Sequence, residues 1–171
     1  MRRLAVLAAM VSAFACGGSS NTPTFSANLA HGNEPNQTGF NAPAPNATGT
    51  AAFQLVGTTL TYSLRATGLS SAPNNAHIHL TPAASTPTAP LQGPIVLPLK
   101  FVNTGATVAA NSVTVDDIAT GANIPAGTKD PDDATKLLTF DRLVQLIQGG
   151  RTYVNIHTVN NPSGEVRGDL H

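Results

Sequence analysis

From Thr24 onward, short stretches in which apolar and polar residues alternate are separated by clusters of Gly, Pro and Asn. A period of two sends successive side chains to opposite faces of a β-strand, so each stretch predicts a strand with one buried face. Several short strands with turn signals between them are typical of a β-sandwich or barrel. The expected strands cover residues 25–29, 51–55, 60–66, 75–80, 94–102, 107–115, 151–157 and 164–170.

One segment, Asp133 to Gln148, departs from this alternation. Apolar residues three and four positions apart lie on one face of a helix, and Gly is common directly after the last helical residue. The apolar residues at this spacing are Leu137, Leu138, Phe140, Leu143, Val144 and Ile147, and Gly149 and Gly150 follow them. We therefore expect an all-β, Greek-key β-sandwich with one short amphipathic helix over 133–148.

Composition excludes several classes of partner and site. Only 11% of the residues are charged, and 9 Lys and Arg balance 9 Asp and Glu. A chain without a basic surplus cannot neutralise a run of phosphates, so we expect no nucleic-acid partner. The single Cys excludes an intramolecular disulfide and any site built from several thiolates.

The N-terminus has the pattern of a secretory signal. Two arginines precede the apolar run 4–11, which is too short to span a bilayer, and small residues follow it. Residues 13–16, Ala-Phe-Ala-Cys, resemble a bacterial lipobox, in which the Cys becomes the lipidated first residue. Cleavage by an ordinary signal peptidase, which would leave a free Cys16, is the alternative.

This N-terminal pattern predicts the organisation and location of the chain. We expect a signal peptide over residues 1–15, a lipidated Cys16 with a flexible tether over 16–23, and one domain over 24–171. The domain would be anchored to a membrane of the bacterial cell envelope through the lipid. It would face the periplasm or the exterior.

Three histidines occupy outward positions on two of the expected strands. In residues 76–80, apolar side chains at 76, 78 and 80 leave His77 and His79 together on the opposite face. The same parity in residues 153–157 leaves His157 outward. Two imidazoles about 7 Å apart along one strand face can converge on one ion, and a neighbouring strand can supply a third.

Two hypotheses follow for these rings. Imidazole ligands suit copper and zinc, and a blue-copper His/Cys/Met site is excluded because the one Cys lies at the N-terminus. In the first hypothesis His77, His79 and His157 bind one copper or zinc ion. In the second they form a structural cluster that hydrogen-bonds a Glu and Arg pair and nearby loop carbonyls. The residues expected to surround the rings are Tyr153, Asn155, Glu165 and Arg167, with Glu165 orienting a ring.

Other candidates for chemistry are weaker. The chain has no Gly-x-Ser-x-Gly elbow for a hydrolase nucleophile. His31 lies in the expected loop 31–48 and His171 ends the chain, so we expect both to be solvated surface residues. A non-enzymatic role is expected, with a metal-dependent redox enzyme as the alternative.

Several motifs, taken in order, resemble the CHRD domain. The most specific are Ala-His-Ile-His at 76–79, Gly-Gly-Arg-Thr-Tyr-Val-Asn-Ile-His-Thr at 149–158 and Pro-Ser-Gly-Glu-Val-Arg-Gly at 162–168. This domain is named from the extracellular growth-factor antagonist chordin and is widespread as a single copy in bacterial secreted proteins. The resemblance covers residues 24–171.

The resemblance implies an immunoglobulin-like β-sandwich related in architecture to Cu/Zn superoxide dismutase, whose copper also lies on a His-x-His strand. It implies that the three histidines are those of the family and that Glu165 and Arg167 are its closing pair. Dismutase activity is not expected, because we find no fourth well-placed His and no zinc loop. Growth-factor binding is not transferred, because chordin has several such domains between Cys-rich modules. We expect a membrane-anchored binding module, or a structural and adhesion scaffold without metal.

Overall fold

The computed structural model describes residues 22–35, 46–101 and 107–171, and the expected signal peptide, Cys16 and most of the tether lie outside these ranges. The strands of the main sheet are β1 (Thr24–Ala30), β2 (Thr48–Val56), β3 (Thr59–Thr67), β4 (Pro73–Leu80), β5 (Ile95–Leu99), β6 (Thr107–Ala109), β7 (Ser112–Thr120), β10 (Thr152–Thr158) and β11 (Val166–Leu170). They form one antiparallel sheet in the order β5-β4-β10-β11-β1-β2-β3-β7-β6.

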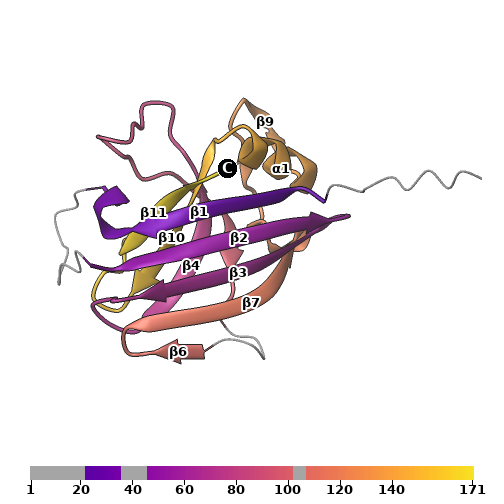
Figure 1. Cartoon of the computed structure of the whole chain (residues 1–171). Helices are drawn as coiled ribbons and strands as arrows, with labels where there is room; N and C mark the ends of the chain where they lie inside the picture. The colour runs from indigo at the N-terminus through magenta and orange to yellow at the C-terminus, as the bar shows by residue number, and fades with distance from the viewer. Residues whose placement is uncertain (1–21, 36–45, 102–106) are drawn as a thin grey trace, which may run out of the picture.

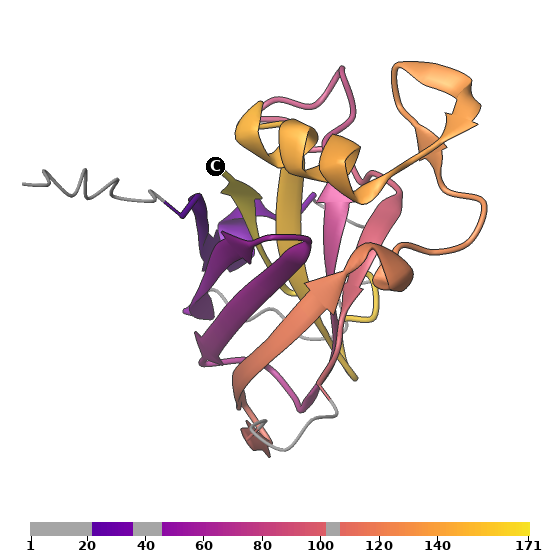
Figure 2. The same cartoon turned by 90° about the vertical axis from the view of Figure 1, so that its right-hand side faces the viewer.

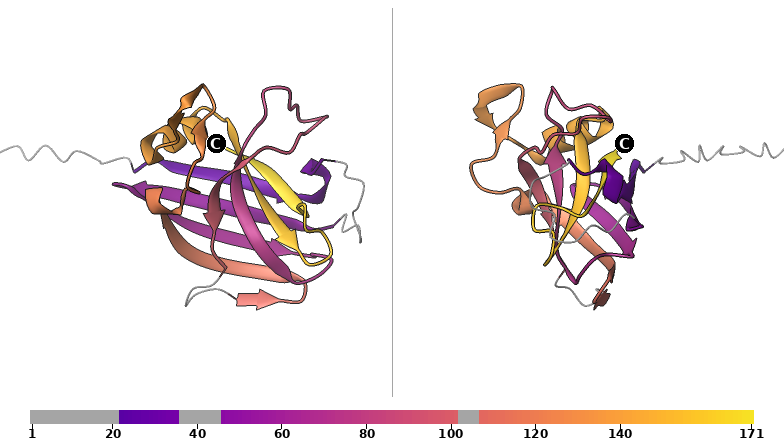
Figure 3. Two further views of the ribbon diagram at one scale, coloured as in Figure 1. Left: turned by 180° about the vertical axis from the view of Figure 1, so that it is seen from behind. Right: turned by 90° about the vertical axis from the view of Figure 1, so that its left-hand side faces the viewer.

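This sheet curls so that its two halves face each other, with β1, β2, β3 and β7 on one side and β4, β5, β10 and β11 on the other (Figures 1 and 3). The expected all-β sandwich with one short helix is therefore confirmed. The halves join where β1 lies beside β11, with Ala30 opposite Arg167 and with backbone hydrogen bonds between Ser26 and His171.

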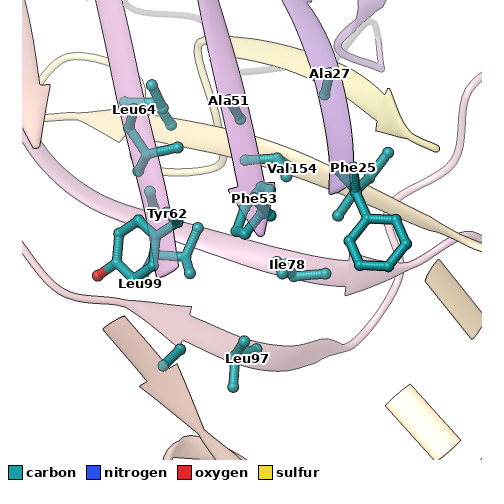
Figure 4. Close-up of a cluster of buried hydrophobic side chains, with 14 of the residues drawn as sticks. Phe25, Ala27, Ala51, Phe53, Tyr62, Leu64, Ile78, Leu97, Leu99 and Val154 are labelled. Carbon is teal, nitrogen blue, oxygen red and sulfur yellow. The ribbon is translucent and has the colours of Figure 1, made fainter. Parts of the chain in front are cut away.

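The core fills the space between the two halves (Figure 4). Phe53 and Leu64 come from one half, and Ile78 and Val154 from the other, and all four are almost completely buried. Removing a side chain of this size from water stabilises a fold by about 1.5–3 kcal/mol. Every one of these residues lies on the inward face that the alternation predicts.

Two expected strands end differently from the prediction. The segment 107–115 was expected to be one strand, but β6 and β7 form a hairpin whose turn is Ala110 and Asn111. The segment 94–102 contains only β5, which lies at the edge of the sheet. Pro98 pairs with His77 there, and a Pro is tolerated at an edge because it has no N–H to donate to a further strand.

The expected helix over 133–148 is wrong in its first third. Asp133–Leu137 is strand β9, which pairs with β8 (Lys129–Asp130), and α1 spans Phe140–Gln148. The Thr139 hydroxyl caps α1 by accepting a hydrogen bond from the Arg142 backbone N–H. Leu137, which the helical pattern included, is exposed. The cap therefore overrides the apolar spacing.

Helix α1 covers one end of the curled sheet (Figure 2). Its buried face consists of Leu143, Val144, Leu146 and Ile147, which join the core. Two 3-10 turns, η1 (His31–Asn33) and η2 (Gly121–Asn123), follow β1 and β7. Within the described residues no helix has the length and apolar character that crossing a membrane requires.

Candidate metal centre

Strand β10 is buried on both faces, which sets the site apart from an ordinary sheet surface. Its inner face belongs to the core. Over its outer face runs the β4–β5 connection, in which the Gly93 N–H donates to the Tyr153 hydroxyl at 2.9 Å. The Gln92 amide of the same segment donates to the Ser163 carbonyl at 2.8 Å. The outward positions of the prediction are thus confirmed in parity, but most of them lie under a covering layer.

The register of β4 against β10 brings the three histidines together. Tyr153 lies opposite His79, Asn155 opposite His77, and His157 is one pair further along. The ring centroids of His77 and His157 are 4.7 Å apart, and those of His77 and His79 are 5.4 Å apart. One ring nitrogen from each of the three lies within 4.8 Å of the other two.

Hydrogen bonds fix the protonated nitrogen of each ring. His79 Nδ1 lies 2.8 Å from the Gly93 carbonyl oxygen, and His157 Nδ1 lies 2.9 Å from that of Pro162. A carbonyl oxygen only accepts, so both Nδ1 atoms carry the proton and both Nε2 atoms carry a lone pair. His77 Nδ1 then donates to His157 Nε2 at 2.9 Å.

The neutral form is favoured at all three rings. Burial lowers the pKa of His77 to about 4, and the neighbouring rings of His157 and His79 lower it further. Burial also lowers the pKa of His79 to about 4. Burial lowers the pKa of His157, against the opposing effect of its hydrogen bond to Pro162. The lone pairs are therefore available at neutral pH without loss of a proton.

These rings fit a copper or zinc ion in the chemistry of their donors. Two nitrogens bound to one tetrahedral ion at about 2.0–2.1 Å are roughly 3.4 Å apart, close to the spacing found here. A ligating His normally donates its other ring N–H to a carbonyl or carboxylate, as His79 and His157 do. Binding an ion would replace the His77 to His157 hydrogen bond with two metal–nitrogen bonds.

Tyr153 and Arg167 support the ring of His79. The Tyr153 ring stacks on His79 with centroids 4.8 Å apart and planes at 8°. From the strand on the other side of β10, the Arg167 guanidinium carbon lies 3.4 Å from the Tyr153 centroid. Arg167 also donates to the Leu91 carbonyl at 2.8 Å, which holds down the β4–β5 connection. The structure thus places both residues beside the rings, as expected.

Glu34 was missed by the sequence analysis. It follows η1, is 6% exposed and lies against Asn155, which is 0% exposed. Burial raises the pKa of Glu34 to about 7, although Arg167 and then Asn155 oppose the shift. A Cβ atom on Gly164 would lie 2.5 Å from Glu34 Oε1 and 2.9 Å from Asn155 Nδ2, so only Gly leaves room for this pair.

Glu165 lies elsewhere than the sequence predicts. Its carboxylate accepts hydrogen bonds from the Ser70 hydroxyl at 2.7 Å, Thr158 at 2.5 Å and Asn161 at 2.9 Å, and it orients none of the three rings. The physical reason is that β11 begins at Val166, so Glu165 belongs to the preceding turn, where strand alternation does not fix a side chain. Loop carbonyls orient the rings instead.

The two remaining histidines lie apart from the three rings. His31 was expected to be solvated, but it is partly buried and its Nδ1 lies 3.0 Å from the Glu165 carbonyl oxygen. His171 is exposed, as expected. No sequence signal distinguishes His31, because its contact joins residues 134 positions apart.

Comparison with known proteins gives one match. A family model described as the CHRD domain matches residues 25–170. No curated protein and no solved structure matches the chain. The family match therefore covers every strand and ring described above except the last residue and the first residue of β1.

The buried neutral rings predict a pH-dependent stability. Below pH 6.5 the unfolded chain protonates His79, whereas the folded chain does so only near pH 4, so stability falls across that interval. A shift of this size corresponds to about 3 kcal/mol. Glu34, with its raised pKa, gains stability over part of the same interval, so the comparison must be with a variant that retains Glu34.

The test is urea unfolding at pH 7 and pH 4 for the protein and for His79→Gln. The variant should lose less unfolding free energy between the two pH values, whatever its stability at pH 7. His171→Gln, at an exposed position, should behave as the unchanged protein does. Equal losses in His79→Gln and the unchanged protein would contradict the burial of a neutral ring.

Proposed function

Since the chain belongs to the CHRD domain family, we propose that it is a non-enzymatic binding module whose His77, His79 and His157 bind one copper or zinc ion. One observation carries the proposal. Three imidazoles on two paired, buried strands have ring nitrogens within 4.8 Å of one another, and two of them have the opposite nitrogen fixed by a carbonyl.

A specific polar atom favours metal binding over a purely structural cluster. His79 Nε2 is buried, and within the described part of the chain it has no hydrogen-bond partner. A buried polar group without a partner costs roughly 1–3 kcal/mol, so native structures rarely retain one without a reason. An ion bound at this nitrogen supplies that reason, whereas a scaffold role leaves the cost without compensation.

The donor set favours copper over zinc. All three ligands are imidazoles, which both ions accept, and affinity for a given nitrogen site rises from Zn²⁺ to Cu²⁺ in the divalent series. The rings belong to strands and their Nδ1 atoms are fixed by hydrogen bonds, so the chain organises the ligands before the ion binds. We propose that Cu²⁺ binds more tightly than Zn²⁺.

The role proposed for the ion is binding without turnover. The three rings line a cavity of about 550 Å³ together with Asn74, Asn75, Gln92, Gly93, Pro94, Ile95, Pro162 and Ser163. Among these described residues there is no Asp, Glu or Lys to act as a general acid or base beside the ion. An amide-lined cavity suits capture of a ligand more than proton transfer.

We also propose that the module is anchored to a bacterial envelope membrane through a lipid on Cys16. The lipobox-like residues 13–16 and the Gly- and Ser-containing tether that follows support this proposal. The tether would hold the metal site away from the membrane, on the periplasmic or outer side.

Metal titration tests the binding proposal. Isothermal titration of the purified protein with Cu²⁺ should give one site per chain with a micromolar or tighter dissociation constant, which is about 8 kcal/mol or more. Zn²⁺ should bind the same site more weakly. His77→Ala/His79→Ala should bind Cu²⁺ at least about 100-fold more weakly, because it lacks two of the three ligands.

Two controls accompany this titration. His171→Ala removes an exposed histidine and should leave Cu²⁺ binding unchanged. Circular dichroism of the double variant shows whether it is folded, and His77→Ala alone changes a half-buried ring if it is not. No binding tighter than about millimolar in the unchanged protein would reject the metal site and favour the scaffold role.

Lipid anchoring has its own test. In a bacterial host supplied with labelled palmitate, the full chain should incorporate the label and sediment with membranes. Cys16→Ser should do neither, because it lacks the thiol that receives the lipid. Ser19→Ala, in the tether, should behave as the unchanged chain does. An unlabelled, soluble product from the unchanged chain would instead indicate ordinary signal-peptidase cleavage.

A further inference from the structure

The proposed metal centre has an unbalanced charge, and this inference rests on the proposed function. Three neutral imidazoles leave a divalent ion with its full charge of two. The described residues that line the cavity supply no carboxylate to balance it. A divalent ion on three protein ligands also keeps at least one coordination position for a ligand from solvent.

The nearest buried charges do not balance the ion. Glu34 lies behind Asn155 and is coupled electrostatically to the Arg167 guanidinium. Arg167 itself lies over the ring of Tyr153. A carboxylate and a guanidinium that face each other contribute little net charge to the ion beyond them.

The cavity offers donors where an anion would lie. Asn75 is the register partner of His157 across β4 and β10, so its exposed amide stands directly beside a ligand. Gln92 and Ser163 line the same cavity. Amide N–H and hydroxyl groups donate hydrogen bonds to an anion without competing with it for the metal. The volume of about 550 Å³ admits a small molecule.

We propose that the metal-loaded centre captures a small monovalent anion, with one donor atom on the ion and a hydrogen bond from the Asn75 amide. The natural ligand class is a small carboxylate. The cavity would then select by charge through the ion and by shape through its neutral amide wall. This gives the binding module a ligand of defined chemistry as well as an ion.

Azide and acetate test the proposal on Cu²⁺-loaded protein. Each anion should shift the copper absorption and electron paramagnetic resonance spectra with saturable, one-to-one behaviour. Asn75→Leu should bind azide about tenfold more weakly, because it loses a hydrogen bond to a charged group, while its Cu²⁺ affinity stays unchanged. Asn28→Leu, the same change at an exposed position of β1, is the matched control and should bind azide normally.

The outcomes separate this proposal from the one on which it rests. If Cu²⁺ does not bind in one-to-one stoichiometry, both proposals fail. If Cu²⁺ binds but neither anion changes the spectra, the anion site alone is rejected. Equal azide affinity in Asn75→Leu and Asn28→Leu also overturns it, because the cavity wall then contributes nothing to binding.

Discussion

The site depends on β10 lying between β4 and β11 with both of its faces buried. Pairing with β4 sets His79 and His77 opposite Tyr153 and Asn155, and pairing with β11 sets Arg167 opposite Asn155. A shift of one residue in either pairing would send these polar side chains into the core and the core residues outward. Val154 and Ile156, which are fully buried on the inner face, fix the register and hence the position of the rings.

The covering layer makes a centre out of what would otherwise be a polar sheet surface. Gly93 is its central residue, since its N–H donates to Tyr153 and its carbonyl accepts from His79. A Cβ atom at this position would overlap the Leu80 carbonyl, so the close approach requires Gly. On the other side of β10, Gly164 has a φ of 126° and leaves space for Glu34 beside Asn155. Both glycines act through the space they leave.

The alternation along single strands predicted the fold class, the inward core residues and the shared face of the three histidines, because a period of two is a local property. Residues that reach the site from distant parts of the chain could not be predicted in this way. Glu34 and Gly93 meet β10 only through the tertiary fold, and no local pattern marks either of them. The start of α1 and the direction of Glu165 were missed for a related reason, since a cap and a turn each overrode a periodic pattern.

The most direct test of a three-histidine metal centre is a crystal of the protein grown with Cu²⁺ and measured on both sides of the copper absorption edge. The account predicts one strong anomalous peak bonded to nitrogens of His77, His79 and His157, at about 2.0–2.1 Å. It also predicts that His79 and His157 keep their hydrogen bonds to the Gly93 and Pro162 carbonyls. A peak at His171 alone, or none at the three rings, would contradict it.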